Sequence, residues 1–449
     1  MAAGFQAQLV ATNLTKPRGI KFDTSGRLLV VQSGHGLTTL ELSDSEGCVT
    51  VNSSRDLVTA SSLNHGIEMT DDGKTLFASD PEAVYKWSYD PSSGRISTNS
   101  TIIKGMSTED HTTRTLLLSK KVNGTLVVTR GSTANIDPEA ESLSSGHSQV
   151  KAFNLTNLTD TYDFNTDGLL LGWGLRNDVG VDEEPTTGRL YTVENSVDEM
   201  NRSGVDIHQN NPGEELNYLG FLNRSASEDV GNYGYPTCFT AWNVSAIPSN
   251  EGLSVGSPFV IGDLNATNND TTCANTVPPR LTFQAHMAPL DILFNPTGSI
   301  AWITFHGSWD RTDPSGYKLS AVDFSNGEPN EPSNSTTALI DIMANQDNGQ
   351  CPDNCFRPVG LAFDGQGRLF MTSDATGEIW MITQQNGQAV ASASPTGPPT
   401  ASSTTGGGES GTSSGSAASS SPSSDANRYV GSWIAVLIAV VASLSAGLT

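Results

Sequence analysis

A short pattern of alternating apolar and polar residues recurs along most of the chain. Each copy has an apolar run, a turn rich in Asp, Asn and Gly, and a second apolar run. Period-two alternation on both sides of a turn predicts a β-hairpin. The six copies are Pro17–Val31, His65–Ser79, Leu116–Val128, Val179–Val193, Leu290–Thr304 and Val359–Thr372.

Most copies are followed by a third strand-like segment, such as Ala83–Ser88 or Tyr317–Val322. Self-similarity at intervals of about 45 to 70 residues is typical of the blades of a β-propeller. We therefore predict an all-β protein in which residues 1–385 form one closed, six-bladed β-propeller. The long interval between the fourth and fifth copies is expected to form loops on one face, at Asn201–Asn243 and Ala246–Pro279. A pair of β-sandwiches is the structural alternative.

Composition narrows the classes of function. The chain has 449 residues, and its 24 Lys and Arg against 48 Asp and Glu give a net charge of −24. This excludes nucleic acid as a partner, because binding a polyanion needs clustered Lys and Arg. Twelve Asn-x-Ser/Thr sequons predict a secreted glycoprotein. They lie at Asn13, Asn52, Asn99, Asn123, Asn154, Asn157, Asn201, Asn223, Asn243, Asn265, Asn269 and Asn334.

The last part of the chain has a different composition. Residues 386–431 are rich in Ser, Thr and Gly, which predicts a disordered, O-glycosylated stalk. Residues 432–449 form an apolar tail with no Lys or Arg after it. With the small residues at Ser423–Asn427, this pattern favours a GPI-attachment signal over a transmembrane helix. We expect a cell-surface protein that is attached to the membrane only through this anchor.

A cell-surface protein needs a signal peptide at its N-terminus. Met1–Phe5 has neither the basic nor the apolar region of a signal peptide, so we expect the true start to be missing from this sequence.

The cysteines also fit an oxidising compartment. Five cysteines are present, and proximity pairs Cys351 with Cys355 and Cys238 with Cys273. Cys48 is left over, and we expect its partner in the missing segment.

Polar residues gather at the head of each repeat, just before its first apolar run. In a propeller these heads converge at one end of the central channel, although they are distant in sequence. Four of the seven histidines and four of the fifteen arginines fall in the heads. Taken singly, each arginine could cap a strand or pair with an acid; together they indicate a site for an anion, particularly a carboxylate. The heads are Asn64–Gly66, His111–Arg114, Gly174–Asn177, His286–Pro289, His306–Arg311 and Phe356–Pro358.

Several motifs together resemble the soluble quinoprotein glucose/sorbosone dehydrogenases, most closely the fungal pyrroloquinoline-quinone (PQQ) dependent pyranose dehydrogenases. The motifs are Trp173-Gly-Leu-Arg-Asn177, His111-Thr-Thr-Arg-Thr-Leu116, Phe305-His-Gly-Ser-Trp-Asp-Arg311 with Gly316-Tyr-Lys318, and Asn232-Tyr-Gly-Tyr-Pro236. The likeness runs from about Phe5 to Ile382. It implies a six-bladed propeller that holds PQQ and a calcium ion over its channel and oxidises the C1 hydroxyl of a sugar to a lactone.

The resemblance also implies roles for individual residues. His111 is implied as the base that takes the hydroxyl proton while a hydride moves to PQQ. Calcium is implied at Ser196 and Val197, through backbone carbonyls, where it acts as a Lewis acid on the quinone. PQQ carries carboxylates and an ortho-quinone, so its pocket needs cations and hydrogen-bond donors. The implied cofactor-binding residues are Asn64, Arg114, Arg130, Arg176, Asn177, Arg311, Lys318 and Arg357.

The chain departs from the bacterial pattern in two places. After the strand that follows the catalytic histidine, the bacterial enzymes have an orienting aspartate, whereas this chain has Val128-Thr-Arg-Gly-Ser132. Either Arg130 serves cofactor or substrate directly, or another group orients His111. The bacterial calcium turn is Gly-Pro, and Ser196-Val197 matches it here. Candidates to support that loop, or to bind a second calcium, are Glu214, Glu215 and Asn217.

Two other classes of function remain alternatives. Propeller lactonases and esterases hold a central calcium with carboxylates and asparagines, whereas the heads here offer Arg and His. A non-enzymatic carbohydrate-binding propeller on a stalk fits the glycans but gives no reason for the arginines. For the dehydrogenase, the sequence leaves the sugar open. Its electron acceptor is expected to be a haem b cytochrome domain, a quinone or a copper oxygenase.

Overall fold

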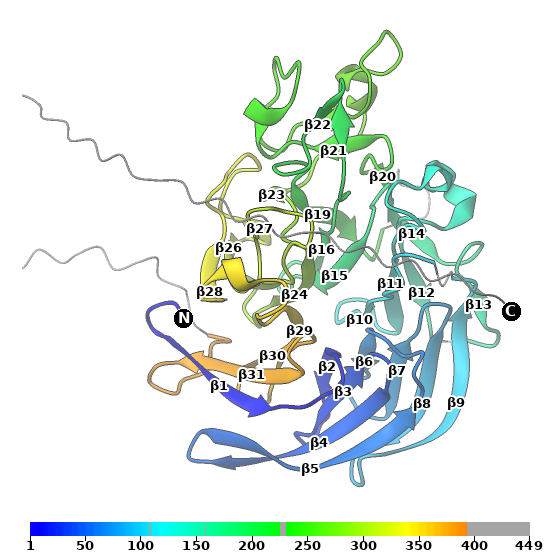
Figure 1. The fold of residues 1–449 in the computed structure, drawn as a ribbon. Coiled ribbons are helices and arrows are strands. Elements are labelled where there is room, and N and C mark those ends of the chain that lie inside the picture. The colour runs from blue at the N-terminus through cyan, green and yellow to red at the C-terminus, as the bar shows by residue number, and fades with distance from the viewer. Residues whose placement is uncertain (107–108, 157, 225–229, 393–449) are drawn as a thin grey trace, which may run out of the picture. The chain divides into compact units, whose positions relative to one another are not determined.

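The structure is a computed structural model, and it describes residues 1–106, 109–156, 158–224 and 230–392. Six sheets of four or five strands surround a common centre, and two short hairpins lie beside them (Figure 1). The prediction of an all-β, six-bladed propeller is therefore confirmed. The predicted GPI signal and nearly all of the predicted stalk lie outside the described residues. Within the described ranges, no helix is long and apolar enough to cross a membrane.

The first three blades are built from strands in chain order from the centre outward, except that β13 and β20 are added at outer edges. Blade 1 contains β2 (Pro17–Phe22), β3 (Leu28–Gln32), β4 (Gly36–Ser45) and β5 (Cys48–Thr59). Blade 2 contains β6 (Ile67–Met69), β7 (Thr75–Ser79), β8 (Val84–Asp90) and β9 (Arg95–Lys104), with β13 (Tyr162–Asp163) at its edge. Blade 3 contains β10 (Leu116–Leu118), β11 (Thr125–Arg130), β12 (Gln149–Asn154) and β14 (Leu169–Trp173), with β20 (Gly231–Asn232) at its edge.

Blades 4 and 5 are interrupted by longer connections, and blade 6 is completed by the N-terminal strand. Blade 4 contains β15 (Asp178–Glu183), β16 (Arg189–Glu194), β19 (Glu214–Phe221) and β23 (Leu281–Phe283). Blade 5 contains β24 (Pro289–Phe294), β25 (Ile300–Phe305), β26 (Lys318–Ser325) and β28 (Ile340–Ala344), with β27 (Glu328–Pro329) beside β26. Blade 6 contains β29 (Pro358–Phe363), β30 (Leu369–Ser373), β31 (Glu378–Gln384) and β1 (Phe5–Ala11).

The ring is closed by the N-terminal strand. β1 pairs antiparallel with β31, with Phe5 opposite Gln384, so blade 6 combines the two ends of the folded region. The Phe5 ring also packs edge-on against Trp302 of blade 5, with centroids 6.2 Å apart. This pairing covers an edge that would otherwise expose unpaired backbone groups.

One part of the predicted loop region is a strand. The expectation of loops throughout Asn201–Asn243 is wrong at Glu214–Phe221, which is β19 and the third strand of blade 4. Its first half carries Glu214, Glu215 and Asn217, and all three are buried. Buried polar side chains break the apolar alternation on which strand prediction depends. The rest of the two predicted loop segments also contains two short hairpins. They are β17 (Asn201–Arg202) with β18 (Val205–Asp206), and β21 (Cys238–Thr240) with β22 (Pro258–Val260).

The predicted disulfides are both present. Cys238 pairs with Cys273, and Cys351 pairs with Cys355. Cys48 is free and exposed at the start of β5. Of the predicted glycosylation sites, nine asparagines are exposed, two are half-buried, and Asn157 is not described. Their position on the surface agrees with glycosylation, which stays a prediction.

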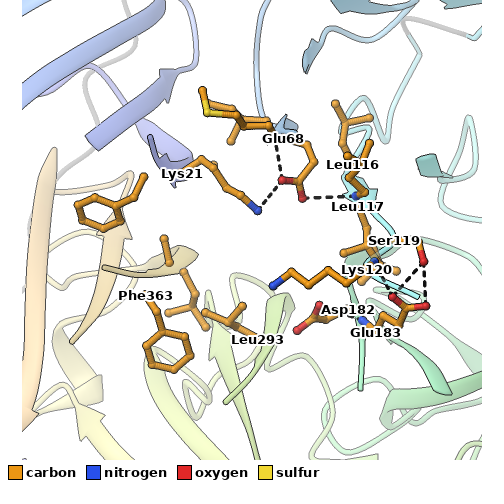
Figure 2. Close-up of a pocket in the computed structure, with 18 of the residues that line it drawn as sticks. Lys21, Glu68, Leu116, Leu117, Ser119, Lys120, Asp182, Glu183, Leu293 and Phe363 are labelled. Carbon is orange, nitrogen blue, oxygen red and sulfur yellow. Dashed lines mark hydrogen bonds and ion pairs between the residues drawn. The ribbon is translucent and has the colours of Figure 1, made fainter. Parts of the chain in front are cut away.

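Buried carboxylates connect neighbouring blades along the channel. Glu68, Asp182 and Asp291 each lie on an innermost strand and accept a backbone N–H from the innermost strand of the next blade, at 3.4, 2.7 and 2.7 Å respectively. Lys21 of β2 joins blade 1 to this set through an ion pair of 2.5 Å with Glu68. Figure 2 shows Lys21 reaching Glu68 and Lys120 pointing into the same space. These contacts hold the innermost strands around a cavity of about 930 Å³, which also reaches the hairpin turns.

Burial changes the ionisation of the channel acids. It raises the pKa of Asp291 to about 8 and that of Asp182 to about 6, although the backbone N–H groups they accept partly oppose this. A carboxyl with a raised folded-state pKa binds its proton more tightly in the folded than in the unfolded protein. Its contribution to stability is present at low pH and is lost as the pH rises from the unfolded pKa, about 4, to the folded pKa.

The contribution of Asp182 should therefore be lost between about pH 4 and 6, and that of Asp291 between about pH 4 and 8, at about 1.4 kcal/mol per pH unit for each group. Asp291→Asn, which mimics the protonated acid, should reduce the slope, most clearly between about pH 6 and 8. Urea unfolding across this pH range measures it, and the exposed Asp313→Asn is the matched control. An unchanged slope in Asp291→Asn would contradict the assignment.

Candidate functional site

The repeat heads lie at the ends of the innermost strands that are opposite to the hairpin turns. Arg18, at the head of blade 1, donates to His65 Nδ1 of blade 2 (3.2 Å) and pairs with Asp374 of blade 6 (2.6 Å). His306 of blade 5 binds the second oxygen of Asp374 at 2.7 Å. Arg357 donates from Nε to the carbonyl of His306 at 3.0 Å. Blades 1, 2, 5 and 6 are therefore joined at this end, in part through Asp374.

The heads of blades 2, 3 and 4 are joined in the same way. Asn64 donates from Nδ2 to the carbonyl of Thr112 at 3.0 Å. The backbone N–H of Ser132 donates to the carbonyl of Arg176 at 2.8 Å. The predicted convergence of the heads is thus seen in the described chain, at the end away from the turns.

Ser132 determines which nitrogen of His111 carries the proton. His111 Nδ1 lies 3.1 Å from the Ser132 carbonyl oxygen and 2.9 Å from its Oγ. That hydroxyl donates to the carbonyl of Ala134 (2.8 Å), so it acts as an acceptor toward the imidazole. Both partners therefore require Nδ1–H, and Nε2 is left with a lone pair. Asp110, 3.5 Å from Nδ1, favours the same tautomer.

The charge of His111 is also set by its surroundings. Burial lowers its pKa to about 3, and the positive charge of Arg176 adds to this effect. His111 is neutral at neutral pH as a result. The alternative that another group orients His111 is the one that the structure shows, and that group is Ser132.

Gly131 allows the backbone beside His111 to approach blade 4. A Cβ at Gly131 would lie 2.5 Å from Asn177 Oδ1 and 2.7 Å from His111 Cβ. Asn177 Oδ1 and Asn64 Oδ1 are both buried and accept no hydrogen bond within the described part of the chain. Buried polar atoms normally have a partner, so these two oxygens mark a place for a ligand or water.

Arg176 is buried and uses its whole guanidinium group. Nη1 donates to the carbonyl of Ser196 (2.6 Å), Nη2 to Asp198 (2.9 Å), and Nε to the carbonyl of Asn135 (3.0 Å). Its backbone N–H donates to Glu194 at 2.6 Å. The side chain holds the loop that follows β16 against blade 3, so its charge lies near His111 but its donors are occupied by protein.

Glu214 supports the loop that was expected to bind calcium. Its two oxygens accept the backbone N–H of Ser196 (2.8 Å) and of Ala288 (3.1 Å), which joins blades 4 and 5. Burial raises the pKa of Glu214 to about 8. The Val197 side chain is buried among apolar residues, so only its backbone is available to a metal.

Arg114 and Arg357 donate to backbone carbonyls. Arg114 is fully buried and donates to the carbonyls of Pro81, His111 and Thr113 at 3.0, 2.7 and 2.7 Å. Arg357 donates from Nη2 to the carbonyl of Gly307 (2.7 Å), in addition to His306. Backbone carbonyls carry no net charge, so these contacts do not neutralise the guanidinium groups.

Three predicted cofactor residues have other partners. Arg130 donates to Asn165 at 2.6 Å, and Lys318 pairs with Asp341 at 2.7 Å. Arg311 donates from Nε to the carbonyl of Asp313 at 2.9 Å. Among the residues the structure describes, no hydrogen bond or ion pair joins these three to His111 or Arg176. Their role in binding a cofactor stays a prediction.

Three residues at the head end of the channel were not among those predicted from the sequence. Arg18 follows Pro17 and stands where the sixth copy has Val359 after Pro358, so the repeat alignment gave no signal for it. Asp374, which binds both Arg18 and His306, follows β30 and likewise has no signal in the repeat. Ser132 acts partly through its backbone carbonyl, which no residue type reveals. The large channel cavity does not identify the site either, because His111 and Arg176 do not line it.

Comparisons with known proteins identify the family of this chain. The family model described as TrAA12-like matches residues 1–385. The chain is 46% identical, over 85% of its length and 89% of the other, to a protein of Hypocrea jecorina (strain QM6a) named pyrroloquinoline quinone-dependent sugar dehydrogenase. It is 36% identical to a pyrroloquinoline quinone-dependent pyranose dehydrogenase of Coprinopsis cinerea, over 87% of this chain and 55% of that protein.

Solved structures give the same picture. A calcium structure of a Trichoderma reesei protein of Carbohydrate-Active Enzymes Family AA12 has a TM-score of 0.82 and 47% identity, over 85% of this chain and 96% of that one. The holo form of the Coprinopsis cinerea pyranose dehydrogenase PQQ domain has a TM-score of 0.79 and 36% identity, over 85% and 96%. A PQQ-bound aldose sugar dehydrogenase of Streptomyces coelicolor, 14% identical with a TM-score of 0.54, shows the fold alone. This chain belongs to the TrAA12-like family.

Proposed function

We propose that this protein is a PQQ-dependent dehydrogenase that oxidises the C1 hydroxyl of a pyranose sugar to a lactone. The names of its relatives support the class of reaction. The observation that carries the proposal is His111, a neutral histidine whose Nε2 lone pair is set by Ser132 and which lies beside a cluster of arginines. Such a group is suited to take the proton of a sugar hydroxyl.

The residues at the heads fit an anionic cofactor. Positive charge at this end is strong enough to help lower the pKa of His111, which suits an anion. Among the described residues, the buried amide oxygens of Asn64 and Asn177 accept no hydrogen bond and could accept one from a donor group of the cofactor. Asn64, Asn177 and Arg357 would hold PQQ, and Arg176, whose donors are occupied by protein, would attract it through its charge. When bound, PQQ supplies the hydride acceptor.

His111 then moves the proton. Nε2 takes it from the C1 hydroxyl, while the Ser132 carbonyl and hydroxyl continue to accept from Nδ1–H and stabilise the imidazolium that forms. A bound anion beside Arg176 offsets the positive charge that lowers the pKa of His111, which makes the imidazole a stronger base in the complex.

We propose that the enzyme also binds calcium, without assigning the ion a step in the reaction. The calcium structure of the Trichoderma reesei relative supports it. The expected donors at Ser196 and Val197 do not form a free oxygen cage, because the Ser196 carbonyl accepts from Arg176 at 2.6 Å. No step of the reaction is therefore derived through calcium.

We also propose where the protein is located and which groups accept its electrons. The sequons and the C-terminal pattern support a secreted, glycosylated protein with a GPI anchor. A haem b cytochrome domain, a quinone or a copper oxygenase is proposed as electron acceptor.

The first experiment measures turnover. Cofactor-free protein is mixed with PQQ, with and without Ca²⁺, and offered a panel of aldoses and ketoses with an artificial electron acceptor. Reduction of the acceptor that requires both PQQ and sugar is expected. A folded protein that binds PQQ but oxidises none of the sugars would defeat the proposal.

His111→Ala tests the base. The variant should retain PQQ and lose about 100- to 10,000-fold in turnover, the usual contribution of a general base. Arg176→Ala should instead release PQQ more readily, since it removes positive charge and loosens the loop at Ser196. PQQ fluorescence and steady-state rates separate the two effects. Normal turnover in His111→Ala would move the base to another group, such as His306 or His65.

Gly131→Ala tests the close approach between His111 and Asn177. The added methyl group must displace one of these side chains, so turnover should fall about a hundredfold while the fold is kept. Gly365→Ala is the matched control, because nothing lies within 4 Å of a Cβ there. Equal rates in the two variants would show that the spacing at Gly131 has no role.

A further inference from the structure

Another group of chemistry-bearing side chains lies between loops of blades 4 and 5. It consists of Asp198, His286 and Asp310; one ring nitrogen and one oxygen of each carboxylate lie within 4.8 Å of one another. Asp198 follows β16, His286 precedes β24, and Asp310 follows β25. Three separate loops therefore bring one imidazole and two carboxylates to one point.

Hydrogen bonding decides which nitrogen of His286 carries the proton. Nε2 lies 2.5 Å from the carbonyl oxygen of His208, so Nε2–H must be the donor. In the neutral ring Nδ1 therefore has a lone pair, and it lies 3.3 Å from the carboxylate of Asp310. Two electron-pair donors thus face each other.

Asp310 is buried without a group that explains its burial. Its side chain is only 3% exposed. Neither carboxylate oxygen accepts a hydrogen bond within the ranges that the structure describes. An ionised carboxylate is costly to bury without a partner. A positive species between Asp310 and His286, either a metal ion or a proton, removes this cost.

We propose that Asp198, His286 and Asp310 bind a divalent metal ion that accepts nitrogen and oxygen ligands, such as Zn²⁺. Ligands at about 2.1 Å from a tetrahedral Zn²⁺ are about 3.4 Å apart. The separation of His286 Nδ1 from Asp310 is 3.3 Å. A hydrogen bond from the other ring nitrogen to a backbone carbonyl, as His286 makes, is the usual way of orienting a metal-bound histidine.

The site is chemically distinct from the calcium site expected at Ser196 and Val197. Ca²⁺ takes oxygen ligands, whereas this group includes an imidazole nitrogen. The two are linked through Asp198, whose Oδ2 pairs with Arg176 at 2.9 Å. A metal ion would hold Asp198 in place and so restrain the Arg176 guanidinium. Metal binding at this site requires neither PQQ nor sugar.

Metal binding is tested with the full chain after removal of bound metal by a chelator. Calorimetric titration with Zn²⁺ should show one strong site, and mass spectrometry should find one Zn²⁺ per chain. Asp310→Asn and His286→Gln should each weaken binding by at least about tenfold. His35→Gln, which alters a histidine of blade 1 that pairs with Asp56, should leave the affinity unchanged.

Two results would overturn the proposal. Equal affinity in the wild type, Asp310→Asn and His286→Gln would place the metal elsewhere. Absence of Zn²⁺ binding by the folded wild type would mean that a proton alone lies between the two groups.

A spectrum of the wild type gives a readout that does not depend on how the variants fold. One equivalent of Cu²⁺ should give an electron paramagnetic resonance spectrum with coupling to a single imidazole nitrogen, and prior saturation with Zn²⁺ should abolish it. A spectrum without imidazole coupling would contradict the site.

Discussion

The structure depends on the pairing of β1 with β31, which closes the ring of blades. This pairing joins the two ends of the folded chain in blade 6. Every innermost strand delivers the loop before it to the same end of the channel, so closure sets where each head lies. It also brings Arg18 of blade 1 to Asp374 of blade 6, and through Asp374 to His306 of blade 5. The cluster of heads is therefore a consequence of closure.

Buried charges use the backbone as their partner at both ends of the channel. Toward the turns, Asp182 and Asp291 accept N–H groups of the next blade, and burial raises their pKa values. Toward the heads, Arg114 and Arg357 donate to carbonyls. Neither kind of contact neutralises the charge, and protonation relieves the acids. Burial, together with the positive charges of Arg176 and Arg114, keeps His111 neutral, and positive charge suits the head end to an anion.

Apolar strand residues could be placed from the sequence, whereas buried polar residues and the directions of long charged side chains could not. The innermost hairpins were predicted because both of their faces pack on neighbouring blades or on the channel, and their apolar pattern is strong. β19 was missed because Glu214, Glu215 and Asn217 resemble surface residues and are in fact buried. Arg130 and Lys318 were grouped with the site by their place in the repeat. Whether such a side chain turns toward the channel or toward Asn165 or Asp341 depends on neighbours that are distant in sequence.

The sequence by itself determined the repeat, the number of blades, both disulfide pairs and the enrichment of Arg and His in the heads. These follow from local alternation and from residue type, which are written in the order of the amino acids. Tertiary structure alone decided the tautomer of His111, the partners of Arg176 and the meeting of Asp198 with His286 and Asp310. Each of these depends on a hydrogen bond or a distance between loops that come together only when the strands pair and the blades pack, and backbone carbonyls, which supply many of the partners, are the same in every residue.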